Sequence, residues 1–265
     1  MLQLYINDEF FDKPREDNLF LTLFRPSLDI VYEDENLMLL NKRPGLVVHP
    51  DESERVNTLL THIQAYLYQK KEWSPYQEGA FAPALCNRID RNTGGIVIAA
   101  KTAEGLRVMN QKIRDRELKK YYLCIVHGTL PRPAGRLEGY ILKDEAKKQV
   151  TVSSRPRPGA KTAVTLYETL AVRNGLSLVR CQLITGRTHQ IRAQFAAAGH
   201  PLLGDGKYGS ERQNKRYGRS YQALYSYRLE FCFTTDAGAL APLDGQQFQV
   251  EQVDFVTEYF PGFSL

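Results

Sequence analysis

The chain between residues 121 and 184 is a succession of short segments with the composition of β-strands: YYLCIVHG, GRLEGYILKD, KKQVTVS, TAVTLYETLAVRNG and LSLVRCQLI. Glycine, proline or asparagine residues punctuate the junctions between them. Strands and helices do not alternate regularly, so a Rossmann-like sheet is disfavoured. Consecutive strands with few helices predict an α+β domain built on a mixed, largely antiparallel central sheet with flanking helices.

Further strands and a few helices are expected on either side of this run. Strand-like segments lie at 29–34, 36–42, 94–101 and 225–233. Helices are expected over 56–71 with Asn57 as the cap, over 102–120, and over 189–201, which Gly199 ends; a short one is expected near the C-terminus. The apolar face of the second helix comprises Leu106, Met109, Ile113 and Leu118.

Size and composition exclude several classes of protein. At 265 residues and 43% hydrophobic, the chain can bury a substantial core. No apolar stretch approaches the roughly 20 residues that a membrane span needs, and the start of the chain is acidic where a signal peptide would be basic. The four cysteines are scattered without C-x-x-C spacing, which favours buried reduced thiols over a zinc site or disulfides. We expect a cytoplasmic protein that binds neither membrane nor metal.

The net charge of +5 is unevenly distributed along the chain. Residues 1–36 carry three Lys or Arg against nine Asp or Glu, and residues 37–100 carry seven against six. Residues 230–265 carry none against six, which leaves 25 basic and nine acidic residues, a balance of +16, for residues 101–229. A well-solvated surface could have this balance. A positively charged face for a polyanion explains it better, because phosphate neutralisation supplies most non-specific affinity for nucleic acids.

One carboxylate is conspicuous in the stretch CNRIDRNTGGIVIAAKT, residues 86–102. Asp90 lies between Arg88 and Arg91 and precedes a Thr-Gly-Gly turn and an apolar strand. A carboxylate paired with a buried guanidinium keeps its charge and its orientation, which suits a nucleophile better than a general acid.

A second dense motif, LITGRTHQIRAQFAAAGHPLLGDGKYG, covers residues 183–209. Arg187, His189 and Arg192 lie where a strand passes into a helix, so the first turn would present N–H groups and cations to an anion. That anion is either a phosphate of a ligand or a protein carboxylate such as Asp90.

Other catalytic classes find little support in the sequence. It contains no G-x-S-x-G, no P-loop and no H-E-x-x-H. His49, His127 and His200 are each isolated, which indicates structural roles. Hydrolysis by paired carboxylates would need a second acid beside Asp90, and none is near it in the sequence.

Four segments resemble, in the same order, the motifs of the RluA-type pseudouridine synthases, which isomerise uridine in RNA to its C-glycoside. NRIDRNTGGIVIAAK resembles the H-R-L-D-x-x-T-S-G-L signature, and ENLMLLNKRPGLVVHP resembles the opening strand pair. RELKKYYLCIVHG resembles the K-x-Y strand of that family. The motif at 183–209 resembles its T-G-R-x-H-Q-I-R and G-H-P-x-x-G-D-x-x-Y-G block.

The resemblance implies a pseudouridine synthase fold with a central basic cleft, and it gives roles to individual residues. Asp90 matches the nucleophile, which attacks C1′ or C6 of the uridine, and Arg192 matches the arginine that salt-bridges it. Tyr122 matches the catalytic tyrosine that stacks on the base, and Arg88 matches the arginine that fills the gap left by the flipped uridine. Leu203 matches an apolar residue of the base pocket. The further residues expected to bind RNA are Arg91, Arg187, His189, Lys119 and Lys120.

The sequence also departs from the family pattern. Asn87 stands where His is usual, Ile89 replaces Leu, Gly94 replaces Ser, and Pro44 lies one place later than is common. None of these changes removes Asp90. The family requires neither metal nor cofactor, so we expect none.

We expect residues 28–265 to form the catalytic domain and residues 1–27 to be an N-terminal extension, which we hypothesise to be the remnant of an upstream S4-type RNA-binding module. The basic centre suits structured RNA, with large-subunit ribosomal RNA favoured over transfer RNA. Two alternatives remain open at this point: a non-catalytic RNA-binding or ribosome-assembly factor, and an RNA hydrolase. A monomer is expected.

Overall fold

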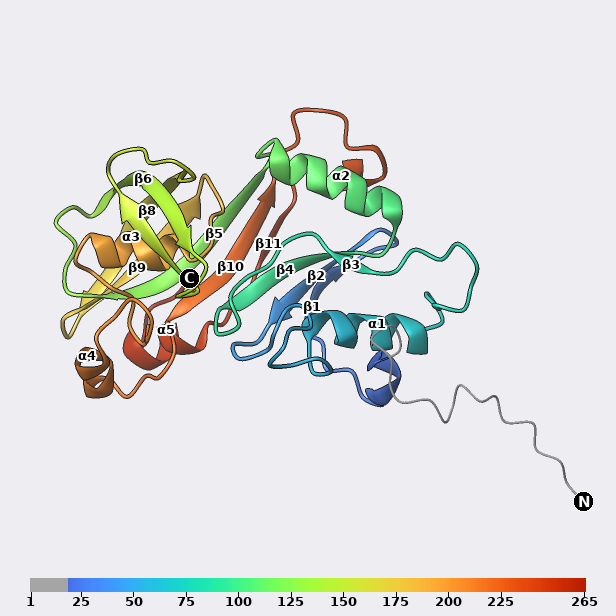
Figure 1. The fold of residues 1–265 in the computed structure, drawn as a ribbon, viewed down its shortest axis with the longest axis horizontal. Coiled ribbons are helices and arrows are strands. Elements are labelled where there is room, and N and C mark those ends of the chain that lie inside the picture. The colour runs from blue at the N-terminus through green and yellow to red at the C-terminus, as the bar shows by residue number, and fades with distance from the viewer. Residues whose placement is uncertain (1–18) are drawn as a thin grey trace, which may run out of the picture.

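The computed structural model describes residues 19–265, whose strands form one eleven-stranded sheet in the order β1-β2-β4-β10-β5-β9-β8-β6-β7 (Figure 1). β3 pairs with β4, and β11 pairs with β10, beside this path. The strands are β1 Ile30–Glu33, β2 Leu37–Lys42, β3 Ala84–Leu85, β4 Gly94–Ala100, β5 Leu118–His127, β6 Ala134–Asp144, β7 Gln149–Ser153, β8 Lys161–Arg173, β9 Leu176–Leu183, β10 Leu224–Phe231 and β11 Gln247–Gln249. Of the strand pairs within residues 19–265, only β4 with β10 is parallel. The predicted α+β class with a mixed, largely antiparallel sheet is confirmed.

Helices cover both faces of this sheet. They are the 3-10 helices η2 Leu19–Thr22 and η3 Gly238–Leu243 and the α-helices α1 Leu59–Gln69, α2 Ala103–Arg114, α3 Gln190–Ala197, α4 Glu211–Arg216 and α5 Asp254–Tyr259. In Figure 1, α2 runs above β4 and ends at the upper end of β5, whereas α3 lies among β6, β8 and β9.

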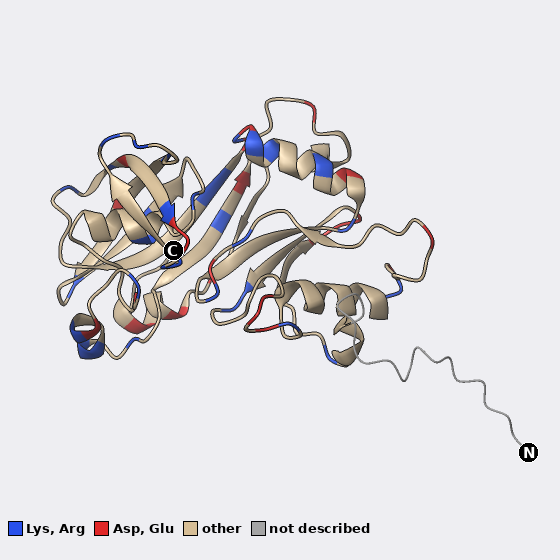
Figure 2. Cartoon of the chain, viewed as in Figure 1, with Lys and Arg blue, Asp and Glu red and all other residues tan. Residues whose placement is uncertain are grey.

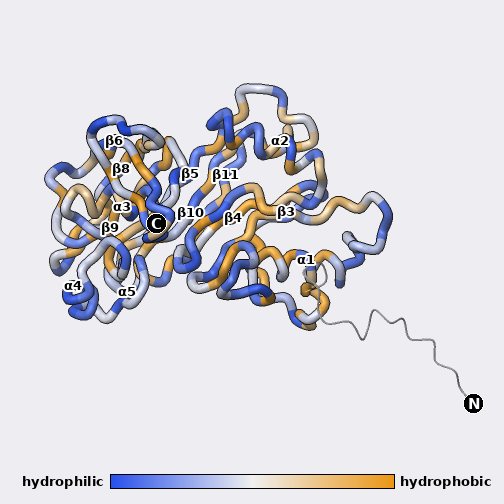
Figure 3. The backbone as a smooth tube through the Cα atoms, in the orientation of Figure 1, coloured by the Kyte–Doolittle hydropathy of each residue, from blue (hydrophilic) through white to orange (hydrophobic). Residues whose placement is uncertain are grey.

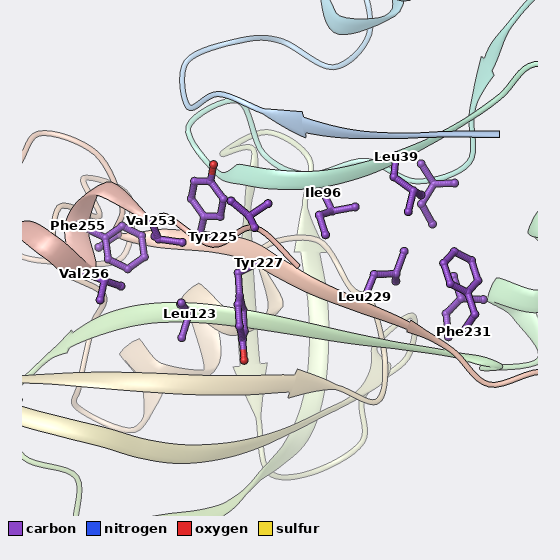
Figure 4. Packing of buried hydrophobic residues seen from close by; sticks show 14 of the residues in the cluster. Leu39, Ile96, Leu123, Tyr225, Tyr227, Leu229, Phe231, Val253, Phe255 and Val256 are labelled. Atoms are coloured by element: carbon purple, nitrogen blue, oxygen red, sulfur yellow. The ribbon is translucent and has the colours of Figure 1, made fainter. Parts of the chain in front are cut away.

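Alternate residues of the strands supply two cores, one on each face of the sheet. In β2, Leu37 and Leu39 pack in the cluster that includes α2, η3 and α5, whereas Met38 and Leu40 pack in the cluster that includes α1 and α3. Figure 4 shows part of the first cluster, and Figure 3 shows hydrophobic residues along β4. Because both faces are covered, β4 is a continuous apolar run and β2 begins with four apolar residues in succession, without polar alternation.

The helix expected over 102–120 is shorter than predicted. α2 ends at Arg114, and Leu118 is the first residue of β5. Arg116 adopts a left-handed conformation with φ of 62°, which a helix interior does not accommodate. Beyond it, Lys120 pairs with β10. The apolar face of the helix therefore stops before Leu118, whose side chain is buried as part of the sheet.

The N-terminal cap of α1 is Thr58, one residue after the predicted Asn57. The hydroxyl of Thr58 accepts the backbone N–H of Thr61 at 3.2 Å. The Asn57 side chain instead contacts the His62 ring at 2.9 Å. The capping hydroxyl thus comes from the residue directly before the first helical turn.

Residues 19–27, which belong to the expected extension, pack on the rest of the domain. Phe20 is buried, and its ring lies 5.3 Å from that of Tyr68 and 5.2 Å from that of Trp73. The remainder of the expected extension, residues 1–18, lies outside the described residues. No helix within residues 19–265 combines the length and the apolarity that crossing a bilayer demands.

Candidate active site

Asp90 lies in the loop between β3 and β4, where it lines a cavity of about 690 Å³. The walls come from the loop at 86–90, from β5, from the start of α3 and from the β6–β7 hairpin. Segments more than 100 residues apart in the sequence therefore meet at one carboxylate.

Arg192, in the first turn of α3, joins two carboxylates. Its Nη1 donates a hydrogen bond of 2.6 Å to Oδ2 of Asp90. Its Nε and Nη2 donate to the two carboxylate oxygens of Asp205 at 2.7 and 2.9 Å. Asp205 is fully buried, whereas the side chain of Asp90 is 28% exposed. The bidentate pair with Asp205 locks the guanidinium, and the remaining nitrogen orients Asp90.

The electrostatics of this triad keep Asp205 charged. Burial alone would raise the pKa of Asp205, but the hydrogen bonds and charge of Arg192 outweigh burial, so the pKa is lowered. For Arg192, burial acts to lower the pKa and the two carboxylates raise it, with a net increase. The triad thus consists of one cation between two acids, only one of which faces the cavity.

The turn after Asp90 is built for close approach of two strands. The backbone N–H of Thr93 donates to the Asp90 carbonyl at 3.0 Å. Gly95 has φ of +107°, and a Cβ there would lie 2.1 Å from the carbonyl oxygen of Ser226 in β10. Asn87 stands where the resembled motif usually has His, and its Oδ1 accepts the backbone N–H of Ile98 in β4 at 2.8 Å. These contacts fasten the loop to the parallel pair β4–β10.

A buried lysine also holds this loop, through hydrogen bonds to backbone carbonyls. Lys42 is 1% exposed, and its Nζ donates to the carbonyl oxygens of Arg43, Leu46 and Arg91 at 3.0, 2.9 and 2.9 Å. Burial lowers the pKa of Lys42 to about 7, against the opposing attraction of Asp90. An ammonium offers three donors, and the three carbonyls match them.

Tyr122 lies in β5 and lines the cavity. It is 7% exposed, and burial raises the pKa of its hydroxyl to about 12; a hydrogen bond to Ser226 acts to lower it and Asp90 to raise it further. The hydroxyl therefore carries its proton at neutral pH. A buried ring at the cavity wall provides a flat surface on which a base can stack.

Three of the basic residues expected to bind RNA line the cavity: Arg88, Arg187 and Lys120. Three further lysines of the β6–β7 hairpin and its neighbourhood join them, namely Lys143, Lys148 and Lys207. Burial lowers the pKa of Lys120. Figure 2 shows Lys and Arg on β5, on β10 and at the end of α2 near β5.

Two other expected RNA-binding residues do not line the cavity. The Nε of Arg91 donates to the Gly45 carbonyl at 3.1 Å, so this side chain braces the neighbouring turn. Lys119 points to the other side of β5, where its Nζ lies 3.5 Å from Glu230. Strand pleating separates Lys119 from Lys120, because successive side chains face opposite sides.

The structure contradicts the expected place of Leu203. This residue is fully buried and packs in the cluster of α2, η3 and α5, whereas Tyr122 packs in the cluster on the other face of the sheet. The N–H of Leu203 donates to Ile125 of β5 at 2.8 Å. This strand-like pairing directs Leu203 away from the cavity. The apolar residues that line it are Ile89, Ile113, Leu183, Ile191 and Leu224.

His189 is the remaining expected RNA-binding residue, and it lines the cavity beside Asp90. Its Nε2 lies 3.8 Å from Asp90 Oδ2. Sequence reasoning missed Lys42 and Asp205 as parts of this site. Two sequence features could have pointed to them. Lys42 ends an apolar strand directly before Arg-Pro-Gly, and Asp205 lies between two glycines in the motif at 183–209.

Residues 19–265 contain no group of three or more His, Cys, Asp or Glu side chains that could hold a metal ion. The four cysteines carry free thiols. Cys124 and Cys181 are buried with sulfurs 3.8 Å apart, and Cys86 and Cys232 are half-buried.

Comparison with known proteins agrees with the geometry. The family model described as RNA pseudouridylate synthase matches residues 36–197. An uncharacterized RNA pseudouridine synthase of Mycoplasma genitalium is 35% identical over 224 residues, which is 81% of this chain and 67% of that protein. The ribosomal large subunit pseudouridine synthase D of Zymomonas mobilis is 33% identical over 232 residues, 87% of this chain and 69% of that protein.

The solved structure of human RNA pseudouridylate synthase domain containing 4 is similar with a TM-score of 0.65 and 23% identity, over 91% of this chain and 93% of that one. This likeness shows the fold, which is that of the pseudouridine synthases. Because the family model covers more than half of the chain, and relatives at about a third identity cover most of it, this protein belongs to the RluA-type RNA pseudouridine synthases and is an RNA-modifying isomerase.

Proposed function

We propose that Asp90 is the nucleophile of this pseudouridine synthase and that its substrate is a uridine in large-subunit ribosomal RNA. The observation that carries the first part is the hydrogen bond of 2.6 Å between Asp90 and Arg192, at the edge of a cavity lined by basic side chains. Asp205 holds Arg192 in place, so the direction of the Asp90 carboxylate is set before substrate binds.

The reaction moves the glycosidic bond from N1 to C5 of the same uracil. In one course, Asp90 attacks C1′, the N1–C1′ bond breaks with its electron pair on the base, and a glycosyl ester forms. The base turns, C5 bonds to C1′, the carboxylate leaves, and the C5 proton is transferred to N1. In the other course, Asp90 attacks C6 first. In both, no atom is gained or lost, and the carboxylate is regenerated.

Two cavity residues complete the proposed mechanism. Tyr122 stacks on the flipped base, and its pKa of about 12 makes it a neutral hydrogen-bonding partner at physiological pH. Arg88 occupies the place in the RNA stack that the flipped uridine leaves, a step that is needed because a stacked base hides its reacting atoms. All these side chains come from one chain, so a monomer suffices.

The substrate class rests on the relatives and on charge. Several relatives bear the name ribosomal large subunit pseudouridine synthase D. The central residues 101–229 hold the excess of positive charge. A phosphate-rich RNA fold is attracted to such a face.

The test combines mapping with a charge-removing substitution. Pseudouridines in total RNA from cells with and without the gene, mapped by carbodiimide or mass spectrometry, should differ at large-subunit positions; a loss confined to transfer RNA would overturn the substrate assignment. Purified Asp90→Asn should bind RNA and form no pseudouridine, with Asp115→Asn, an exposed carboxylate on the C-cap of α2, as the matched control. Formation of pseudouridine by Asp90→Asn would overturn the assignment of Asp90 as the nucleophile. Shortened RNA would indicate a hydrolase.

A further inference from the structure

His189 has an unusual backbone for a residue with a side chain of its size. It precedes α3 with φ of 51° and ψ of 23°, in the left-handed region, and its side chain makes no capping hydrogen bond to the helix. A non-glycine residue in this region is strained, and such strain persists where the surroundings require it. Here the left-handed turn carries the imidazole between Asp90 and Tyr208.

The hydrogen bonds of Tyr208 favour one of the two tautomers of the neutral His189 ring. The Tyr208 oxygen accepts the backbone N–H of Val150 at 2.8 Å, and this N–H can only donate. The same oxygen lies 2.8 Å from Nδ1 of His189. Within residues 19–265, Nδ1 is the acceptor available to the hydroxyl proton of Tyr208. This arrangement favours Nδ1 as the acceptor and places the proton of the neutral ring on Nε2, which faces Asp90.

The charges around His189 come from three segments. Asp90 lies in the β3–β4 loop and Arg192 in α3, while Asp205 and Lys207 precede Tyr208. Burial lowers the pKa of His189, Arg192 and Lys207 act in the same direction, and the two carboxylates oppose them. The net lowering favours a neutral ring at physiological pH, in agreement with the hydrogen bond from Tyr208.

Both donors approach the same carboxylate oxygen. Arg192 Nη1 lies 2.6 Å from Oδ2 of Asp90, and His189 Nε2 lies 3.8 Å from that atom. Oδ1 of Asp90 accepts no hydrogen bond from any side chain or N–H within residues 19–265. The carboxylate is thus anchored on one oxygen and leaves the other for the cavity.

The segment that carries Tyr208 is itself tied to the β6–β7 hairpin. Lys207 Nζ donates to the Lys148 carbonyl at 2.7 Å, and Val150 donates to Tyr208. Oδ1 of Asp205 accepts the backbone N–H groups of Lys207 and Tyr208 at 2.9 and 3.1 Å. One short segment therefore holds both Arg192, through Asp205, and His189, through Tyr208.

We propose that His189 is a positioning residue for Asp90, held by Tyr208 as the neutral ring with its proton on Nε2, so that Oδ2 is anchored and Oδ1 is the attacking oxygen. This proposal rests on the proposed role of Asp90 as nucleophile. The gap of 3.8 Å is wider than a hydrogen bond and closes with a small shift of either side chain when the flipped uridine fills the cavity.

The first test needs neither RNA nor activity, so its failure is separable from failure of the proposed function. Long-range ¹H–¹⁵N spectra of the wild-type protein report the tautomer and titration of each of the five histidines. The expected result is His189 as the Nε2–H tautomer with a midpoint below about 6.5. A proton on Nδ1, or a charged ring at pH 7.5, would overturn the proposal.

The second test separates positioning from folding. Tyr208→Phe removes the hydroxyl that donates to His189, so the pKa of His189 should rise and single-turnover conversion should fall about tenfold, equivalent to about 1.4 kcal/mol. RNA affinity should stay within about twofold. Tyr217→Phe is the control: it also removes a phenolic hydroxyl, one that donates a single hydrogen bond to the Asn174 carbonyl and does not line the cavity.

A conservative replacement completes the design and covers the case in which Tyr208→Phe does not fold. His189→Gln keeps an N–H donor that can reach Asp90, and His189→Ala keeps none. His189→Gln should retain more conversion than His189→Ala. Equal conversion by both variants, at unchanged RNA affinity, would contradict the positioning role.

Discussion

The Nζ of Lys42 donates to the carbonyl of Arg91 at 2.9 Å, so the last residue of β2 holds the loop that carries Asp90. A buried ammonium of this kind makes stability depend on pH. The pKa of Lys42 is lowered to about 7 in the fold, chiefly by burial, whereas an unfolded lysine has a pKa of about 10.4. Between these values the unfolded chain binds more protons, so the free energy of unfolding rises with pH.

The first prediction follows from this sign. Below pH 7 the buried amine of Lys42 is charged, and its burial lowers the free energy of unfolding by the full amount. This destabilisation declines as the pH rises towards 10, because the buried amine loses its proton. The unfolding free energy from urea titration should increase between pH 7 and pH 9 by about 2 kcal/mol. Lys42→Met should abolish the increase and also destabilise the protein, because three carbonyls lose their donor. An equal pH slope in both proteins would contradict the titration of Lys42.

The second prediction concerns Asp205, the buried partner of Arg192. Asp205→Asn leaves the guanidinium without a full counter-charge and should lower the unfolding free energy by roughly 3–5 kcal/mol. Conversion should fall as well, because Arg192 is then free to rotate away from Asp90. Urea unfolding and single-turnover assays measure both effects, and the exposed Asp115→Asn should change neither. Wild-type stability in Asp205→Asn would argue against a locked guanidinium.

The sequence was informative about the candidate site where chemistry is concentrated in short motifs. Asp90 and Arg192 are 102 positions apart, yet each lies in a dense motif with an expected charge partner, and the structure brings them within hydrogen-bond distance. The order of strands from residue 121 to residue 184 was also readable, because turn residues separate the strands. These features depend on local composition, which a single sequence displays.

Other features depend on packing between distant segments, which a single sequence does not display. Leu203 occupies a motif position expected at the base pocket, but its pairing with β5 directs it into the opposite core. Leu118 continues the helical spacing of α2, but the left-handed Arg116 ends the helical path before it, and Leu118 is the first residue of β5. Lys42 has the sequence context of an exposed strand end, and only the fold buries it beneath the Asp90 loop.

The third prediction concerns Gly95 of β4, which pairs with Ser226 of β10. Alanine at this position would place Cβ 2.1 Å from the Ser226 carbonyl and impose φ of +107° on a residue with a side chain. Gly95→Ala should therefore destabilise the protein by at least about 2 kcal/mol, since left-handed strain alone costs about 1–2 kcal/mol. Gly206→Ala is the control, because nothing lies within 4 Å of a Cβ there; it should stay within about 0.5 kcal/mol. Thermal or urea unfolding compares the two.

The fourth prediction uses two adjacent lysines on opposite sides of β5. Lys120 lines the cavity, whereas Lys119 lies beside Glu230. If RNA phosphates enter the cavity, Lys120→Ala should weaken RNA binding and reduce the slope of log affinity against log salt by about 1, because one fewer counterion is released. Lys119→Ala removes the same charge from the neighbouring residue and should leave the slope nearly unchanged. Filter binding over a range of salt concentrations measures both slopes. A slope that changes equally in the two variants would mean that diffuse charge on β5, and not the cavity, attracts the RNA.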